Sequence, residues 1–263
     1  MKIEYRWAFN QFAGLPYLTA DLIAHQPSVI VAAGSLGPAL VAKRATSTIP
    51  IVFIFGGDPV KYGLVQSLNR PGGNITGVIA NTTELAGKRL GLLRELVPQA
   101  KTVAFLAGPP NDITYEEQTS LILEAGHALG LEVVVVECRD ERDFERAFET
   151  MVVRRVGALI IGTFPVGNLN GVIPLAARHS IPTMYPFRGL VMNGGLISYA
   201  PEPINLGQVA TQYVARILKG TKPADLPVQQ STKYEFVINL KTAKALGLTI
   251  PETLLATADE VIQ

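Results

Sequence analysis

Two short turns carry side chains that could bind a ligand or take part in catalysis. Residues 33–37, with the sequence A-G-S-L-G, follow an apolar run, open an amphipathic stretch and place Ser35 at the turn. Residues 56–59, with the sequence G-G-D-P, follow a second apolar run and place Asp58 before a proline that opens a helical segment. Small residues leave backbone amides bare, and the first N–H groups of a helix attract an anion. Both turns therefore predict ligand binding at the carboxyl ends of buried strands.

Ser35 has two interpretations, of which we favour the second. The A-G-S-L-G turn is similar to the G-x-S-x-G turn of serine hydrolases, with Asp58 and His179 as nominal partners, but no HGGG-like oxyanion segment precedes it. In the second interpretation Ser35 begins a helix, and its hydroxyl and the free amides bind an anion such as a carboxylate. Asp58 likewise either caps a helix or also meets a ligand ammonium or hydroxyl.

Aromatic and cationic side chains follow other apolar runs of the chain. Phe164, Tyr185 and Phe187 could form the walls of a pocket. Arg188 could bind a carboxylate with its guanidinium group, which would suit a small apolar or aromatic molecule that carries an acid. The alternative is that the aromatic rings belong to the core and that Arg188 lies on the surface.

The rest of the composition excludes several kinds of site. The 263 residues carry a formal net charge of +1 with both signs interspersed, which argues against a nucleic-acid or membrane surface. Cys138 is the only cysteine, so neither an intramolecular disulfide nor a cysteine-rich zinc site can form. The H-E-x-x-H spacing and both glycine-rich nucleotide motifs are absent, so we expect no metal and no cofactor. No apolar run is long enough to span a membrane, and the first residues lack the apolar core of a signal peptide.

The elements that position these residues alternate along almost the whole chain. Apolar, β-rich runs are separated by amphipathic stretches, a pattern typical of parallel sheets built from βαβ units. Several runs are continuously apolar, as expected of strands that are covered on both faces. The predicted strands are Ile3–Trp7, Val29–Ala33, Ile51–Phe55, Thr102–Leu106, Glu132–Val136, Ala158–Ile161, Thr183–Tyr185, Leu196–Tyr199 and Tyr234–Ile238. The predicted helices are Tyr17–His25, Gly37–Ala45, Glu84–Leu96, Glu116–Leu129, Asp143–Arg155, Leu169–His179, Ile204–Leu218 and Lys241–Leu246.

The chain is similar to a known family in three segments. They are residues 49–78 (IPIVFIFGGDPVKYGLVQSLNRPGGNITGV), 185–201 (YPFRGLVMNGGLISYAP) and 219–262 (KGTKPADLPVQQSTKYEFVINLKTAKALGLTIPETLLATADEVI). These segments closely resemble the substrate-binding components of a bacterial ABC-transporter family that includes tryptophan- and tyrosine-type binding lipoproteins. The resemblance covers essentially the whole chain in the correct order.

The resemblance implies a type I periplasmic binding protein: an α/β fold of two Rossmann-like lobes with parallel sheets, no catalysis and no cofactor. The N-terminal lobe would comprise residues 1–80 plus 201–232, and the C-terminal lobe residues 81–200 plus 233–263. Family members begin with a signal or lipoprotein peptide, a strand and a helix before the segment that matches Ile3–Trp7. The first lobe would therefore be N-terminally truncated, and the missing central strand would leave two neighbours with unpaired edges.

The resemblance also implies a function and a site. The chain would be the solute-binding component of an ABC importer that closes around a small organic ligand, such as an aromatic amino acid or a related carboxylate. Its partners would be this ligand and an ABC permease, and its location periplasmic or otherwise extracytoplasmic, with contact to the membrane only through the permease or a missing lipoprotein anchor. A ligand-sensing domain of the same fold is the alternative. The implied ligand-binding residues are Ser35, Asp58, Asn81, Asn111, Thr163, Phe187 and Arg188.

Overall fold

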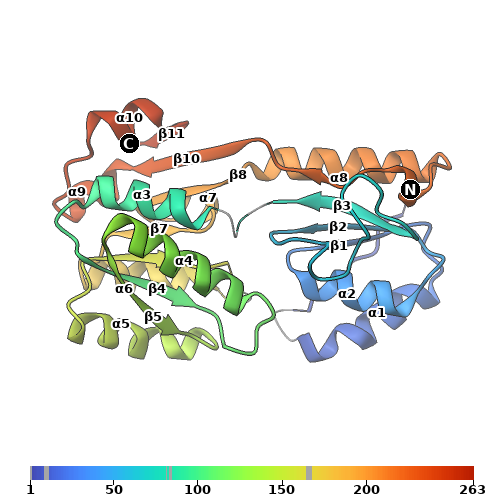
Figure 1. Ribbon diagram of the computed structural model, residues 1–263, viewed down its shortest axis with the longest axis horizontal. Helices are drawn as coiled ribbons and strands as arrows, with labels where there is room; N and C mark the ends of the chain where they lie inside the picture. The colour runs from blue at the N-terminus through green and yellow to red at the C-terminus, as the bar shows by residue number, and fades with distance from the viewer. Residues whose placement is uncertain (1, 9–11, 81, 83–84, 164–167) are drawn as a thin grey trace. The chain divides into compact units, whose positions relative to one another are not determined.

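The computed structural model describes residues 2–8, 12–80, 82, 85–163 and 168–263 (Figure 1). The chain divides into two compact units. Unit 1 comprises Met1–Asn81 and Pro201–Lys233, and unit 2 comprises Thr82–Ala200 and Tyr234–Gln263. Each boundary lies within one residue of the corresponding expected lobe boundary. Among the described residues, no helix is both long enough and apolar enough to cross a membrane.

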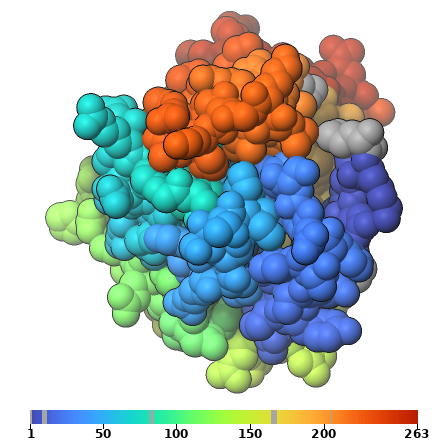
Figure 2. Space-filling view, turned by 90° about the vertical axis from the view of Figure 1, so that its right-hand side faces the viewer, coloured from blue at the N-terminus to red at the C-terminus, as the bar shows by residue number. Residues whose placement is uncertain are grey.

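Unit 1 is built on a four-stranded sheet with the order β1-β2-β3-β9, in which all described pairs are parallel. Helix α8 covers one face of this sheet, and α1 and α2 cover the other (Figure 1). Figure 2 views this unit from its end, with α8 in orange above and the N-terminal helices in blue. The strands are β1 (Ile30–Ala33), β2 (Ile51–Phe55), β3 (Ile75–Ile79) and β9 (Gln229–Gln230), and the helices are α1 (Leu15–Ala24), α2 (Leu36–Ala45) and α8 (Pro203–Leu218). Two 3-10 turns span Phe12–Gly14 and Pro223–Asp225.

Strand β2 shows why a continuously apolar run was needed in this sheet. Its odd residues, such as Phe53, pack with β1 and α2, whereas Val52 packs with Val78 and α8. A strand between two helical layers has no solvent-facing side and therefore loses the alternation of polar residues. The sheet is also closely packed at Gly77, opposite Phe53 in the register, where an added Cβ would lie 2.3 Å from the Phe53 carbonyl oxygen.

Unit 2 is built on a seven-stranded sheet with the order β11-β10-β8-β7-β6-β4-β5. One face packs against α3 and α4, and the other against α5 and α6 (Figure 1). The strands are β4 (Thr102–Ala107), β5 (Glu132–Glu137), β6 (Ala158–Ile161), β7 (Thr183–Tyr185), β8 (Ile197–Pro201), β10 (Tyr234–Asn239) and β11 (Glu260–Ile262). The helices are α3 (Ala86–Leu96), α4 (Tyr115–Leu129), α5 (Phe144–Val153), α6 (Val172–Arg178), α7 (Arg188–Met192), α9 (Leu240–Ala245) and α10 (Glu252–Thr257), with 3-10 turns at Glu141–Asp143 and Leu169–Gly171.

The predicted opening strand Ile3–Trp7 is wrong, because these residues form no strand in the structure. Its charged and apolar side chains nevertheless alternate between a half-buried side and an exposed side. Glu4 binds His25, which directly follows α1 (Nδ1 to Oε2, 2.7 Å), and Arg6 binds Asp21 within α1 (Nε to Oδ2, 2.5 Å), while the apolar side chains of the segment are exposed. The segment is therefore held through its side chains, and β1 is paired with β2 alone among the described strands.

The helical segment expected after Asp58 is also absent, and residues 59–63 form consecutive turns. Gly63 has a φ of +66°, a left-handed conformation that interrupts a helix. Leu64 N–H and Val65 N–H both donate to the Pro59 carbonyl, which folds the segment back on itself. The apolar side chains of Leu64 and Val65 are thereby buried against the sheet of unit 1.

Candidate functional site

Ser35 and Asp58 of unit 1 follow two neighbouring strands. Strands β1 and β2 are parallel, with Ala33 opposite Ile54, so their carboxyl ends lie at the same edge of the sheet. Ser35 comes two residues after β1, and Asp58 three residues after β2. The fold therefore brings these two predicted site residues to one edge, where open α/β sheets bind ligands.

Ser35 occupies the N-cap position of α2, with the extended backbone angles φ −154° and ψ 176°. Gly34 before it has a φ of +102°, which lets the chain turn from strand to helix. The Ser35 side chain makes no capping hydrogen bond and is half-buried. Its hydroxyl and the first N–H groups of this ten-residue helix are therefore available to an anion.

Asp58 is exposed and caps a turn. Its Oδ1 atom accepts hydrogen bonds from the backbone N–H groups of Val60, at 2.8 Å, and Lys61, at 3.3 Å. Asp58 therefore acts as a cap, as the first interpretation expected, but it caps a turn, and no helix follows it. The second carboxylate oxygen accepts no hydrogen bond from the described residues and remains able to meet a cationic or hydroxyl group.

Three predicted site residues of unit 2 follow neighbouring strands. Asn111, Thr163 and Phe187 come after β4, β6 and β7, which are adjacent in the sheet and parallel. Asn111 is exposed in a turn, Thr163 is half-buried, and Phe187 is 49% exposed at the start of α7. The carboxyl edge of this sheet thus presents an amide, a hydroxyl and an aromatic ring. Asn81, which also belongs to the predicted ligand-binding residues, lies outside the described residues, as does Phe164. Arg188 is described below.

Gln118 positions Thr163, a role that the sequence did not reveal. The Gln118 Oε1 atom accepts the Thr163 backbone N–H at 2.9 Å, and its Nε2 atom donates to the Thr163 carbonyl at 2.8 Å. The same Nε2 atom also donates to the Thr114 hydroxyl at 2.8 Å. This buried side chain therefore joins the N-terminus of α4 to the end of β6. A polar residue at the inward-facing position of the first turn of a helix was the signal that could have identified it.

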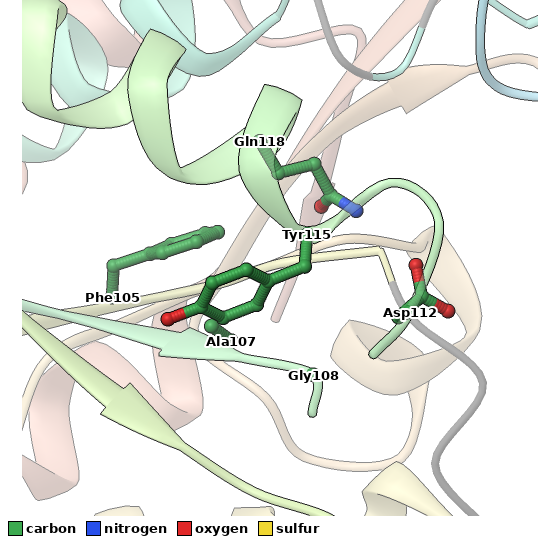
Figure 3. Close-up of a pocket in the computed structure, with 6 residues that line it drawn as sticks. All are labelled: Phe105, Ala107, Gly108, Asp112, Tyr115 and Gln118. Carbon is green, nitrogen blue, oxygen red and sulfur yellow. The ribbon is translucent and has the colours of Figure 1, made fainter. Parts of the chain in front are cut away.

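A narrow hollow lies at the end of β4 beside Gln118 (Figure 3). Tyr115 and Asp112 approach it from α4 and from the turn before that helix. Asp112 Oδ1 accepts the Thr114 N–H at 2.8 Å and the Thr114 hydroxyl at 2.6 Å, which fixes the turn. The hollow has no room for even a water-sized sphere, so on its own it is no small-molecule pocket. Its lining residues are Phe105, Ala107, Gly108, Asp112, Tyr115 and Gln118.

Arg188 is already paired with protein carboxylates. Its Nε atom donates to Glu235 Oε1 at 3.2 Å and to Glu260 Oε2 at 3.1 Å, and its Nη2 atom also binds Glu260. These partners, Glu260 above all, raise the pKa of the guanidinium group further. A ligand carboxylate at Arg188 would therefore have to compete with two acidic side chains. Tyr185, named with it as a pocket wall, is 1% exposed and belongs to the core.

Other reactive side chains give no sign of catalysis. His179 follows the C-terminus of α6 in unit 2, where its ring stacks on Phe148 at a centroid distance of 5.7 Å. Cys138 is buried, and burial together with Asp143 and Asp140 raises the pKa of its thiol to about 12. Within the described residues, no group of three or more histidine, cysteine, aspartate or glutamate side chains is arranged to hold a metal ion.

Comparisons with known proteins show the family and the fold of the chain. A family model described as ABC transporter substrate binding protein matches residues 1–262. The chain is 26% identical over 250 residues to the Tyrosine-binding protein of Clostridioides difficile (strain R20291), covering 94% of this chain and 71% of that protein. Among solved structures, a conserved domain protein from Vibrio cholerae O1 biovar El Tor is similar with a TM-score of 0.88 at 26% identity, covering 99% of this chain and 87% of that one.

A second solved structure is similar and contains a ligand. It is the ABC domain in complex with L-Trp from Streptococcus pneumonia, with a TM-score of 0.83 at 26% identity, covering 95% of this chain and 86% of that one. The expected fold class, an α/β periplasmic binding protein of type I, is confirmed by these likenesses and by more distant solute-binding proteins of the same fold.

Proposed function

Because the chain belongs to the ABC transporter substrate binding protein family, we propose that it binds a small organic acid with an amino group and delivers it to an ABC importer. Members of the family bind solutes and are not enzymes, so the hydrolase interpretation of Ser35 is wrong. The family is generally extracytoplasmic, and we propose the same location for this protein, with an ABC permease as its partner.

The observation that carries this proposal is the pair of groups at the sheet edge of unit 1. The free Ser35 hydroxyl and the N-terminus of α2 suit a carboxylate, and Asp58 on the same edge suits an ammonium. An α-amino acid carries both groups on one carbon. Nearly a half of the Phe187 side chain is exposed in unit 2, which supports an aromatic amino acid, and two similar proteins are named for tyrosine binding or solved with L-Trp.

Binding would require contacts from both units. Asn111, Thr163 and Phe187 are proposed to contribute from unit 2, and Asn81, the last residue of the chain before unit 2, is proposed to contribute as well. A ligand that contacts both units favours the conformation in which all contacts are made and so shifts the population towards it.

Isothermal titration calorimetry with L-tryptophan, L-tyrosine and L-phenylalanine tests the proposal. We expect Ser35→Ala and Asp58→Ala each to weaken binding by about tenfold or more, the effect of losing one hydrogen bond to a charged group. Ser47→Ala and Asp225→Ala are matched controls, since both side chains are exposed and away from the sheet edge. The proposal fails if the unmodified protein binds none of the three, or if the Ser35 and Asp58 variants bind like the controls.

A further inference from the structure

Arg89 is the one buried guanidinium group among the residues that the structure describes. The residue is 3% exposed, and its charge is met by backbone carbonyls: Nε donates to Tyr199 O at 2.7 Å and Nη2 donates to Pro186 O at 3.3 Å. No carboxylate of the described residues forms an ion pair with it. Burial lowers the pKa of Arg89 to about 10, which still leaves the group charged at neutral pH.

Burying such a cation without an anion is unfavourable, so packing alone does not explain it. An apolar side chain of similar length would fill the same space without the loss of hydration. An apolar side chain would, however, take this donor away from two carbonyl oxygens, of which the bond to Pro186 is buried and the bond to Tyr199 partly buried. The rigid fork of the guanidinium group joins two carbonyls at a fixed separation, and this geometric link is what the residue specifically provides.

The first of these carbonyls, that of Tyr199, lies beside one of the places where the chain passes between the units. The chain leaves or enters unit 2 at three places: it enters at Thr82, leaves after Ala200 and returns at Tyr234. Arg89 lies on α3, the first helix after the first of these places, and Tyr199 immediately precedes the second. The Tyr199 ring stacks on Tyr234 with a centroid distance of 5.8 Å and an interplanar angle of 14°. One connected set of contacts, Arg89 to Tyr199 to Tyr234, therefore links α3, the first helix after the first place, to residues beside the other two places.

The second carbonyl joins the same group to the candidate site. Pro186 directly precedes Phe187, the exposed aromatic residue at the carboxyl edge of the sheet. Strands β7 and β8, which precede Pro186 and contain Tyr199, are neighbours in the sheet. Arg89 consequently fixes the chain before Phe187 relative to the end of β8.

We propose that Arg89 is a positioning residue that aligns the three passages of the chain at the border of unit 2 and sets the place of Phe187. Its effect on ligand affinity rests on the proposed function, whereas its effect on the chain passages does not. A residue with only a packing role would change the stability of the whole unit and would not act on these places selectively.

Hydrogen exchange measured by mass spectrometry tests the alignment without any ligand. Arg89→Met keeps the length and removes the donors, and Arg94→Met makes the same change at an exposed position of the same helix. We expect Arg89→Met to speed exchange at least tenfold in peptides that cover residues 197–200 and 234–236, with α5 unchanged, and Arg94→Met to have no effect. Equal acceleration throughout unit 2, or no acceleration at the two peptides, would overturn the proposal.

Ligand affinity provides the second arm, measured by calorimetry with L-tryptophan and L-tyrosine. We expect Arg89→Met to raise the Kd about tenfold, Arg89→Lys to restore part of the affinity through one donor, and Arg94→Met to leave it unchanged. Should Arg89→Met fail to fold, Arg89→Lys takes its place in both arms, with a smaller change in the same peptides. If the unmodified protein binds neither amino acid, the proposed ligand class fails while the exchange experiment still decides the role of Arg89. An unchanged Kd in a folded Arg89→Met protein that binds ligand overturns the positioning role.

Discussion

Polar residues at the two sheet edges differ in whether their side chains already form hydrogen bonds or ion pairs within the protein. The Ser35 hydroxyl makes no capping bond, whereas the Thr163 hydroxyl donates to Gln118 and Arg188 is paired with two glutamates. A hydrogen bond from a free donor to a ligand contributes more binding free energy than one from a donor that must first give up a partner within the protein. Of the residues chosen by type and position alone, Ser35 is therefore the strongest candidate. The sequence could place Arg188 after a strand, but its acidic partners lie 47 and 72 residues further along the chain and could not be anticipated.

Cys138 gives a prediction at the same scale, because the thiolate and not the thiol reacts with alkylating agents. A pKa of about 12 leaves only about one thiol in ten thousand ionised at pH 8, far less than for an ordinary cysteine. We expect iodoacetamide to leave the native protein unmodified at pH 8 over an hour and to label it fully in urea. Because the pKa is raised, labelling should accelerate with each step of pH up to the point of unfolding. Rapid labelling of the folded protein at pH 8 would show that the thiol is accessible and its pKa ordinary.

At the level of elements, the strongly apolar runs were predicted well and the weaker ones were not. Strand β2 was predicted correctly. Because both of its faces are covered, its five residues are all apolar, and this continuous run is easy to identify in the sequence. Strand β3 was not among the predicted strands, since Thr76 and Gly77 interrupt its pattern; Thr76 is satisfied by the Leu226 carbonyl at 2.6 Å, and Gly77 makes room for Phe53. Ile3–Trp7 has the alternation of a strand without the backbone pairing that a strand needs. Local pattern thus decides an element only where distant partners agree with it.

The close approach of β3 to β2 leads to a prediction about stability. A methyl group at Gly77 would lie 2.3 Å from the Phe53 carbonyl and 2.6 Å from its ring, which forces one strand to move. We expect Gly77→Ala to lower the free energy of unfolding by roughly 2–4 kcal/mol, measured by urea denaturation. Gly207→Ala is the control in the same unit, because it lies inside α8 with open space around it and should stabilise the protein by roughly 0.5–1 kcal/mol. Equal effects of the two substitutions would show that the sheet yields at Gly77.

For the whole molecule, the predicted site residues are divided between the two units. Unit 1 offers groups that suit a carboxylate and an ammonium, and unit 2 offers an exposed aromatic ring and polar groups at its own sheet edge. The sequence indicated both edges through the turns that end the strands, because chain topology places such turns together. It could not indicate Gln118 or Arg89, whose roles depend on contacts across 45 and 110 residues of the chain.

The proposed contacts of a ligand with both units lead to a measurable expectation for the whole protein. A ligand shifts a conformational equilibrium only by the difference between its affinities for the two states, so contacts to both units are required. We expect saturating L-tryptophan or L-tyrosine, whichever binds by calorimetry, to reduce the radius of gyration in small-angle X-ray scattering. D-tryptophan should leave the curve unchanged, because inverting the α-carbon separates the ammonium from Asp58 when the carboxylate stays at Ser35. A ligand that binds tightly without any change in scattering would mean that its contacts come from one unit, and the residues proposed for unit 2 would then have no direct part in binding.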